Sequence, residues 1–221
     1  MARVASFSVV RHRGALTAMR RLGTDRLRRP AGLELRRLLG TGRGSDTGPS
    51  ADLRRTAMFA VWRDEAALDG YLATVADRPG VVERYDVRLR AVGGHGTWRG
   101  VDVLEDLVPG SDRGAVAVLT RADVHLRSWR PFRAAGPAVS AELAGAEGLL
   151  AALGVGELPV GRLGTFSLWS GLDAMGAFNR SPQHREVVRR TRAERWYGEE
   201  LFARFEPYGS SGTWDGRDPL R

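Results

Sequence analysis

The sequence predicts an α+β fold in which one β-α-β-β-α-β unit occurs twice. Three pairs of similar segments, one member of each pair in either half of the chain, predict this duplication. The pairs are residues 39–42 with 153–156, 58–62 with 165–169, and 96–100 with 212–216. A unit of this kind is ferredoxin-like, with helices on one face of a sheet and an apolar opposite face. Two such units in one chain can close their sheets face to face, so the expected architecture is an α+β barrel.

The duplication also predicts where the chain divides. Residues 1–108 are expected to form an N-terminal ferredoxin-like half, and residues 113–221 a C-terminal half that carries the functional site. A connector rich in turn residues, 101–113, separates the two halves.

Alternation and helix breakers place the elements of the first half. Phe7 and Val9 alternate with Ser6 and Ser8, which is typical of a strand with one buried face. The expected elements are a strand at 4–10, a helix at 15–28, a strand or short helix at 33–39, a strand at 56–62, a helix at 64–76 and a strand at 87–92.

A glycine run at residues 40–44 invites comparison with a phosphate-binding loop. Such a loop needs a helix directly after it. Residues 45–52 are polar and include Gly48 and Pro49, which favours a linker. We therefore reject a nucleotide site.

The second half repeats the order of the first. A mixed stretch, 121–133, separates its first strand from an Ala- and Leu-rich helix. The expected elements are a strand at 115–120, a helix at 139–153, a strand at 165–169, a helix from residue 172, a further helix from residue 181 and a strand at 201–205.

Composition excludes several classes of protein. The 221-residue chain has no cysteine, which excludes disulfides, thiolate metal sites and cysteine nucleophiles. The net charge is +8, and every basic residue is an arginine spread over the chain, which favours a solvated surface over a nucleic-acid site. Neither a signal peptide nor a membrane-spanning stretch is evident. We therefore expect a soluble, cytoplasmic protein that binds no nucleic acid.

His184 is the residue whose type and position most strongly suggest a functional role. Ser181 and Pro182 predict a helix start, because serine caps helices and proline is favoured in their first turn. One face of this helix carries an inward stripe: His184, Val187, Val188 and Thr191. The start of a helix favours a neutral imidazole, which is the form that binds a metal. The alternative is an ordinary hydrogen-bonded histidine of the core.

The duplication singles out the same histidine. Residues 78–81 match residues 181–184 through a shared proline, so Val81 takes the place of His184 in the first half. A position explained by packing alone would accept an apolar residue in both halves. The difference favours a ligand role for His184, with the functional site in the second half alone.

Residues 192–205 and 212–220 resemble the C-terminal signature of the spheroidene monooxygenase family. Weaker matches extend the resemblance over nearly the whole chain, at residues 39–42, 119–122 and 166–169, Trp129 and His184. The family comprises oxygenases of carotenoid biosynthesis and is similar to haem enzymes of the dimeric α+β barrel superfamily. The resemblance implies a haem-dependent monooxygenase acting on a hydrophobic specialised metabolite, with haem b as cofactor and His184 as the proximal iron ligand. Arg195 departs from the family, which more often has a small residue there.

The resemblance also implies partners, and the chemistry of a haem site suggests further residues. Besides a small hydrophobic substrate, haem chemistry needs an electron donor or peroxide, and the superfamily implies a homodimer. His12, His95 and His125 match no family position, and we expect them in loops or on the surface. The candidates are Arg130, Arg189 and Arg192 for the haem propionates, Phe166 and Val188 for the pocket, Arg127 and Trp129 for catalysis, and Glu194 or Glu199 to orient His184.

Two other functions stay open. The barrel could act without a cofactor, as small monooxygenases of this fold do, with His184 as a base. It could also bind haem or another hydrophobic ligand without turnover. An absorption spectrum of the purified protein separates these possibilities from the main hypothesis.

Overall fold

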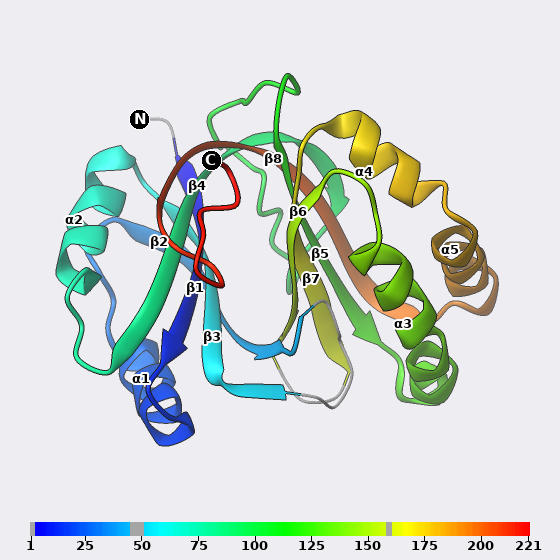
Figure 1. The fold of residues 1–221 in the computed structure, drawn as a ribbon, viewed down its shortest axis with the longest axis horizontal. Helices are drawn as coiled ribbons and strands as arrows, with labels where there is room; N and C mark the ends of the chain where they lie inside the picture. Colours follow the sequence, from blue (N-terminus) through cyan, green and yellow to red (C-terminus); the bar gives the residue numbers. More distant parts are fainter. Residues whose placement is uncertain (1–2, 45–50, 158–160) are drawn as a thin grey trace.

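The computed structural model describes residues 3–44, 51–157 and 161–221, and eight strands of this part form one closed barrel. The strands are β1 (Val4–His12), β2 (Leu33–Gly42), β3 (Ala51–Trp62), β4 (Val81–Gly96), β5 (Val116–Val124), β6 (Leu149–Gly156), β7 (Arg162–Trp169) and β8 (Tyr197–Gly212). Their order around the barrel is β1-β3-β2-β6-β7-β5-β8-β4. The helices lie outside the barrel (Figure 1): α1 (Ala15–Leu27), α2 (Glu65–Val75), the short η1 (Leu126–Ser128), α3 (Trp129–Ala144), α4 (Leu172–Asn179) and α5 (Pro182–Glu194).

The duplication predicted from the sequence is confirmed. The elements from β1 to β4 form one β-α-β-β-α-β unit, and those from β5 to β8 repeat it. The two units meet along two antiparallel seams. β4 pairs with β8 over most of its length, whereas β2 and β6 pair only through Gly40 with Gly156 and Thr41 with Val155. These four residues belong to one of the matched pairs of segments, so the shorter seam joins corresponding segments of the two units.

Apolar side chains of both units fill the barrel interior. Alternate residues of each strand point inward, and the rings of Phe7 and Phe166 stack with their centroids 3.8 Å apart. Trp98 and Trp214 join the same core from the turns that follow β4 and β8. Because side chains fill this interior, a functional site is expected on an outer face or at a barrel end. The division of the chain into residues 1–108 and 113–221 stays a prediction.

The third matched pair of segments forms two similar turns. Gly96 and Gly212 end β4 and β8 with φ angles of 84° and 79°, a region that glycine enters far more readily than other residues. A Cβ atom at Gly96 would lie 2.0 Å from the carbonyl oxygen of Glu200, so close packing also requires glycine. In each turn a tryptophan, Trp98 or Trp214, forms a β-bridge to the residue three positions later.

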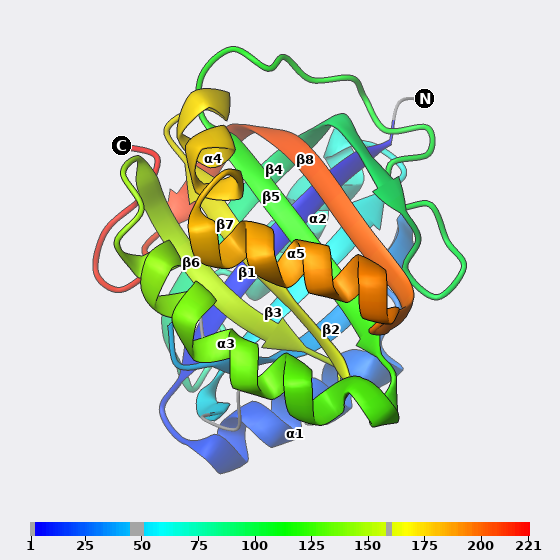
Figure 2. The same cartoon turned by 90° about the vertical axis from the view of Figure 1, so that its right-hand side faces the viewer.

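The helices cover the outer faces of the two units. α1 and α2 pack on the first unit, where Leu68 and Val75 of α2 are buried. α3 and α5 lie side by side over the second unit, with α4 leading from β7 to α5 (Figure 2). Within the described ranges, no helix combines the length and the apolar character needed to cross a membrane.

Two predicted boundaries are wrong. The helix expected over 139–153 is α3, which begins at Trp129 and ends at Ala144, and it is followed by strand β6. Gly148 has a φ angle of 75° and separates the two elements, and Leu153 is buried in the barrel core, so tertiary packing overrides the helix propensity of this Ala- and Leu-rich run. Residues 51 and 52, assigned to a linker, begin β3, while residues 45–50 lie outside the described part.

The match of residues 78–81 with 181–184 is also wrong. Val81 begins β4, whereas His184 lies in the first turn of α5. The second unit has two helices, α4 and α5, where the first unit has α2 alone, so His184 has no counterpart in the first unit. The comparison with Val81 therefore gives no support to a ligand role, which has to be judged from the surroundings of His184.

Candidate functional site

α5 begins where the sequence predicts, but its first turn is held by another helix. Pro182 is in the first turn and Ser181 precedes it, yet the Ser181 hydroxyl does not cap the helix and instead donates to Glu142 of α3. The Glu142 carboxylate also accepts hydrogen bonds from the main-chain amides of Gln183, at 3.4 Å, and His184, at 3.1 Å. A carboxylate is favourable at a helix N-terminus, so Glu142 fixes the start of α5 to α3.

The imidazole of His184 is half-buried and held in one orientation. Its Nδ1 lies 3.3 Å from the carbonyl oxygen of Asn179, and its ring packs against Phe178 with the centroids 4.8 Å apart. A carbonyl oxygen only accepts, so Nδ1 carries the proton, and Nε2, which has no hydrogen bond in the described part of the chain, keeps its lone pair. Burial lowers the pKa of His184, against the opposing effects of Asn179 and Glu142. The neutral imidazole that results can bind a metal or act as a base.

α3 and α5 turn half-buried stripes toward the outer face of the second unit. On α5 the stripe is the predicted one, with Val188 half-buried and Thr191 buried. On α3 the half-buried residues Phe132 and Gly136 lie on the same stripe as Leu143, which is buried against the sheet. A Cβ atom built on Gly136 would meet no heavy atom within 4 Å beyond the backbone of its own helix. Position 136 of α3 is therefore not packed against another element.

Thr120 and Thr165 form a polar pair on the sheet of the same unit. They are register partners on β5 and β7, both are half-buried, and their hydroxyl oxygens lie 2.8 Å apart. Their neighbours Leu119 and Phe166 point into the barrel, so the threonines point outward, to the side that carries the helices. One hydroxyl hydrogen serves this pair, and the other is free to donate to a group bound between sheet and helices.

The structure brings some of the predicted site residues together and separates others. Val188 is four residues from His184 and shares its stripe. Phe166 is fully buried inside the barrel, so it lies on the opposite face of the sheet from the helices. Trp129 begins α3, at the other end of that helix from Glu142. Of these residues, Val188 is the one that lies on the half-buried stripe of His184.

None of the charged candidates makes a hydrogen bond or an ion pair with the imidazole among the described residues, and each has other surroundings. The four arginines suggested by the sequence are all exposed: Arg127, Arg130, Arg189 and Arg192. Arg189 makes two hydrogen bonds, of 2.8 and 2.6 Å, to Glu186 on the outer side of α5. Glu194 accepts from the indole of Trp196 at 2.8 Å, and Glu199 lies at the end of the barrel, so neither carboxylate orients His184.

The sequence does not reveal the two residues that do hold His184. Asn179 acts through its main-chain carbonyl, which carries no side-chain signal. Glu142 is 42 positions away along the chain and contacts α5 only because α3 runs beside it.

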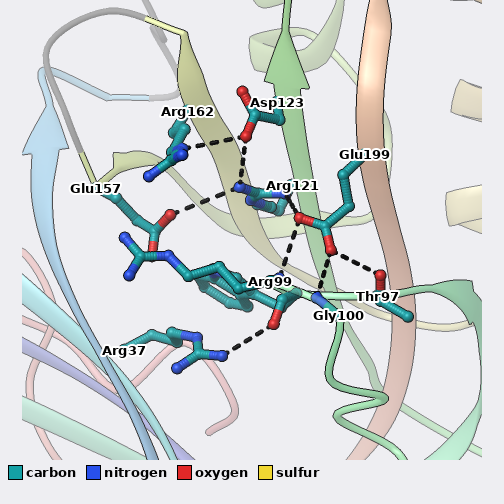
Figure 3. Close-up of polar contacts among 10 residues, drawn as sticks. Arg37, Thr97, Arg99, Gly100, Arg121, Asp123, Glu157, Arg162 and Glu199 are labelled. Carbon is teal, nitrogen blue, oxygen red and sulfur yellow. Dashed lines mark hydrogen bonds and ion pairs between the residues drawn. The ribbon is translucent and has the colours of Figure 1, made fainter.

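A second group of charged residues lies at one end of the barrel (Figure 3). The side chain of Arg121 is 3 % exposed and contacts three carboxylates, among them Glu157 at 3.7 Å and Glu199. Glu199 also accepts hydrogen bonds from the Thr97 hydroxyl and the Gly100 amide, each at 2.7 Å. Burial raises the pKa of Glu199, but the hydrogen bonds and the charge of Arg121 outweigh it and lower that pKa to about 2.

The opposite end of the barrel carries a matched network. There Glu83 accepts from the Thr213 hydroxyl at 3.1 Å and the Gly216 amide at 2.7 Å, as Glu199 does from the other turn. Two flanking positions carry opposite charges in the two networks. Asp123 at one end corresponds to Arg11 at the other, and Arg99 corresponds to Asp215. Because the duplication accounts for both networks, we infer that they stabilise the turns and take no part in catalysis.

Among the described residues, no three histidine or acidic side chains are grouped to hold a metal ion. A metal centre at His184 would therefore have to take this histidine as its single protein ligand. Haem is such a centre, because the nitrogens of the porphyrin, and not protein side chains, supply the other bonds to iron.

The fold and the site together define an α+β-barrel protein of two ferredoxin-like units, with a candidate histidine ligand on an outer helix. The chain is 33% identical over 195 residues to the spheroidene monooxygenase of Cereibacter sphaeroides, and 31% identical over 191 residues to that of Rhodobacter capsulatus. It belongs to the spheroidene monooxygenase family. The alignments cover 83% of this chain in both cases, but 59% of the first relative and 79% of the second. No model of a protein family matches the chain.

Solved structures share the fold. A crystal structure of aldoxime dehydratase covers 96% of this chain and 81% of its own, with a TM-score of 0.61 and 16% identity. An aldoxime dehydratase in complex with butyraldoxime covers 93% and 79%, with a TM-score of 0.58 and 12% identity. At identities this low, the likeness concerns the fold alone.

Proposed function

We propose that this protein is a haem-dependent monooxygenase acting on a hydrophobic, carotenoid-like substrate, with His184 as the proximal iron ligand. Membership of the spheroidene monooxygenase family supports the reaction and the class of substrate. The observation that carries the ligand assignment is the contact of His184 Nδ1 with the Asn179 carbonyl oxygen, because it leaves a neutral Nε2 free to coordinate.

The residues around His184 fit a haem group. The open space at Gly136 and the half-buried stripes of α3 and α5 suit a flat apolar ring. Arg130 and Arg192, exposed on these two helices, are the candidates for the propionates, whereas Arg189 is already engaged by Glu186. Bound there, haem would supply the oxygen chemistry, and an electron donor or peroxide would be its co-reactant.

The chain itself would orient the reactants and keep water away. The Asn179 carbonyl and the Glu142 carboxylate hold the imidazole and the start of α5 in place. The free hydroxyl of the Thr120 and Thr165 pair can donate a hydrogen bond from the sheet side. Apolar residues such as Val188 would exclude water from a bound hydrophobic substrate. We also propose that the enzyme is homodimeric and cytoplasmic.

Titration of the purified protein with haemin, followed by its absorption spectrum, tests the ligand assignment. We expect a saturable Soret band in the parent protein and in His95→Ala, and its loss or displacement in His184→Ala. The His95 side chain is 63% exposed on β4, so His95→Ala is the control for haem ligation by an exposed histidine. A protein that stays colourless, or a His184→Ala spectrum identical to that of the parent with circular dichroism unchanged, would contradict the assignment.

Turnover separates a catalyst from a haem carrier. With peroxide, or with a reductant and oxygen, the haem-loaded protein should convert a carotenoid to an oxidised product. Loading without any product would indicate a carrier. Product formation by haem-free protein would instead support a cofactor-free monooxygenase, in which the neutral imidazole of His184 acts as the base.

A further inference from the structure

The first unit contains a cavity that the proposed function does not use. It has a volume of about 40 Å³ and lies between α1, α2 and the outer face of β1 and β3. This face is on the other side of the barrel from α3, α4 and α5 (Figure 1). A volume of this kind holds about three water-sized positions. The cavity is therefore too small for a porphyrin and suits a ligand of a few heavy atoms.

His12 lines this cavity with an unpaired nitrogen. The residue was expected in a loop or on the surface, but it ends β1 and is 4% exposed. Its Nε2 lies 3.0 Å from the Thr56 hydroxyl oxygen, and its buried Nδ1 has no partner in the described part of the chain. Burial, together with the nearby charge of Arg21, lowers the pKa of His12 and so favours the neutral ring. When Thr56 donates to Nε2, the single ring proton sits on Nδ1 and is available to a ligand.

The charges around the cavity do not balance, although each of two wall arginines is paired with an aspartate, Asp25 on the wall or Asp86 behind it. Arg78 donates to both oxygens of Asp25, at 2.9 and 3.1 Å, and Arg84 donates to both oxygens of Asp86, at 2.5 and 2.7 Å. Arg21 donates only to a main-chain carbonyl, at 3.0 Å, and pairs with no carboxylate among the described residues. Three arginines against two aspartates leave one positive charge beside the cavity. A half-buried cation of this kind is stabilised when an anion binds next to it.

We propose that this cavity binds a small carboxylate, with the Arg21 guanidinium and the His12 Nδ1–H as its donors. The single excess charge matches a monoanion, and the volume matches formate or acetate. Val10, Leu38 and Met58 also line the cavity, so a methyl group has apolar contacts there. This favours acetate over an inorganic oxyanion, which has oxygen at every corner.

Thermal unfolding of the full chain in sodium acetate, compared with sodium chloride at equal ionic strength, measures the binding. We expect acetate to raise Tm in a saturable way that chloride does not reproduce. The NMR signals of the His12 imidazole should shift with the same midpoint. Benzoate, which is too large for the cavity, should leave both quantities at the chloride baseline.

Arg21→Gln and Arg20→Gln form a matched pair on α1, because Arg20 is exposed and does not line the cavity. We expect Arg21→Gln to weaken acetate binding by at least about tenfold and Arg20→Gln to leave it unchanged. If Arg21→Gln folds poorly, the NMR titration of the unsubstituted protein still tests the proposal. The proposal is overturned if acetate acts no differently from chloride, if benzoate acts like acetate, or if both variants weaken binding equally.

Discussion

The Nδ1 atom of His184 lies 3.3 Å from the main-chain carbonyl oxygen of Asn179, the last residue of α4. This contact fixes the tautomer of the imidazole, so the corner between α4 and α5 determines which nitrogen is free to coordinate. A main-chain acceptor survives any substitution at position 179. The supporting side chain that can be removed is Glu142, which holds the first turn of α5.

Glu142→Ala should loosen the start of α5 without unfolding the barrel. The amides of Gln183 and His184 lose their acceptor, so we expect faster hydrogen exchange over residues 182–186. Haem affinity should fall about tenfold, because the ligand is less well held. Glu147→Ala, at an exposed position three residues beyond the end of α3, is the control and should change neither quantity. Unchanged exchange in Glu142→Ala would show that the cap is dispensable.

Phe166 and Val188 should respond in opposite ways to truncation. Phe166→Ala removes a ring stacked on Phe7 inside the barrel, and we expect it to lower the free energy of unfolding by about 3–5 kcal/mol with the haem spectrum unchanged. Val188→Ala should cost less stability and weaken haem binding. Urea unfolding and haemin titration measure the two effects. An altered Soret band in a stable Phe166→Ala protein would place the cofactor against Phe166 after all.

Glu199 should make stability depend on pH in the acid range. Its pKa is about 2 in the folded protein, against an ordinary value of 4.5, so its contribution is present above about pH 4.5 and is lost as the pH falls from there toward 2. At pH 7, Glu199→Gln should therefore be less stable than the parent by about 2 kcal/mol, the scale of a charged hydrogen bond. The gap should narrow below pH 4.5. Glu200→Gln, at an exposed neighbour, is the control, and a gap that does not change with pH would contradict the assignment.

Two glycines of one turn should tolerate alanine very differently. At Gly96 a Cβ atom would lie 2.0 Å from the Glu200 carbonyl oxygen, and we expect Gly96→Ala to cost at least about 3 kcal/mol of stability. Gly100 also has a positive φ angle, 72°, but a Cβ atom there meets nothing within 4 Å, so Gly100→Ala should cost about 1 kcal/mol. Chemical denaturation compares the two variants. Equal losses would show that backbone strain, and not the close approach, decides.

Much of this fold can be read from the sequence because its duplication leaves paired signals. The segments 39–42 and 153–156 match because they are the corresponding ends of β2 and β6, and the turns at 96–100 and 212–216 match because both need the same glycine geometry. The prediction fails where packing overrides local preference, as at residues 149–153. It also fails where one residue type serves two purposes, since Pro79 precedes a strand and Pro182 begins a helix.

The candidate site is predictable only in part, for a related reason. Periodicity finds the stripe that begins at His184, because spacing along one helix fixes which residues share a face. Contacts between elements have no such signature, so the sequence reveals neither the Asn179 carbonyl nor Glu142. His12 shows the same limit, because its burial follows from the helices that cover the end of β1.

The most direct test of the His184 assignment is the rescue of a cavity variant by free imidazole. His184→Gly removes the side chain and leaves space for an imidazole molecule beside the Asn179 carbonyl. We predict that His184→Gly loaded with haemin lacks the parent spectrum and that added imidazole restores it saturably. A His184→Gly protein that shows the parent spectrum before any imidazole is added would contradict the account.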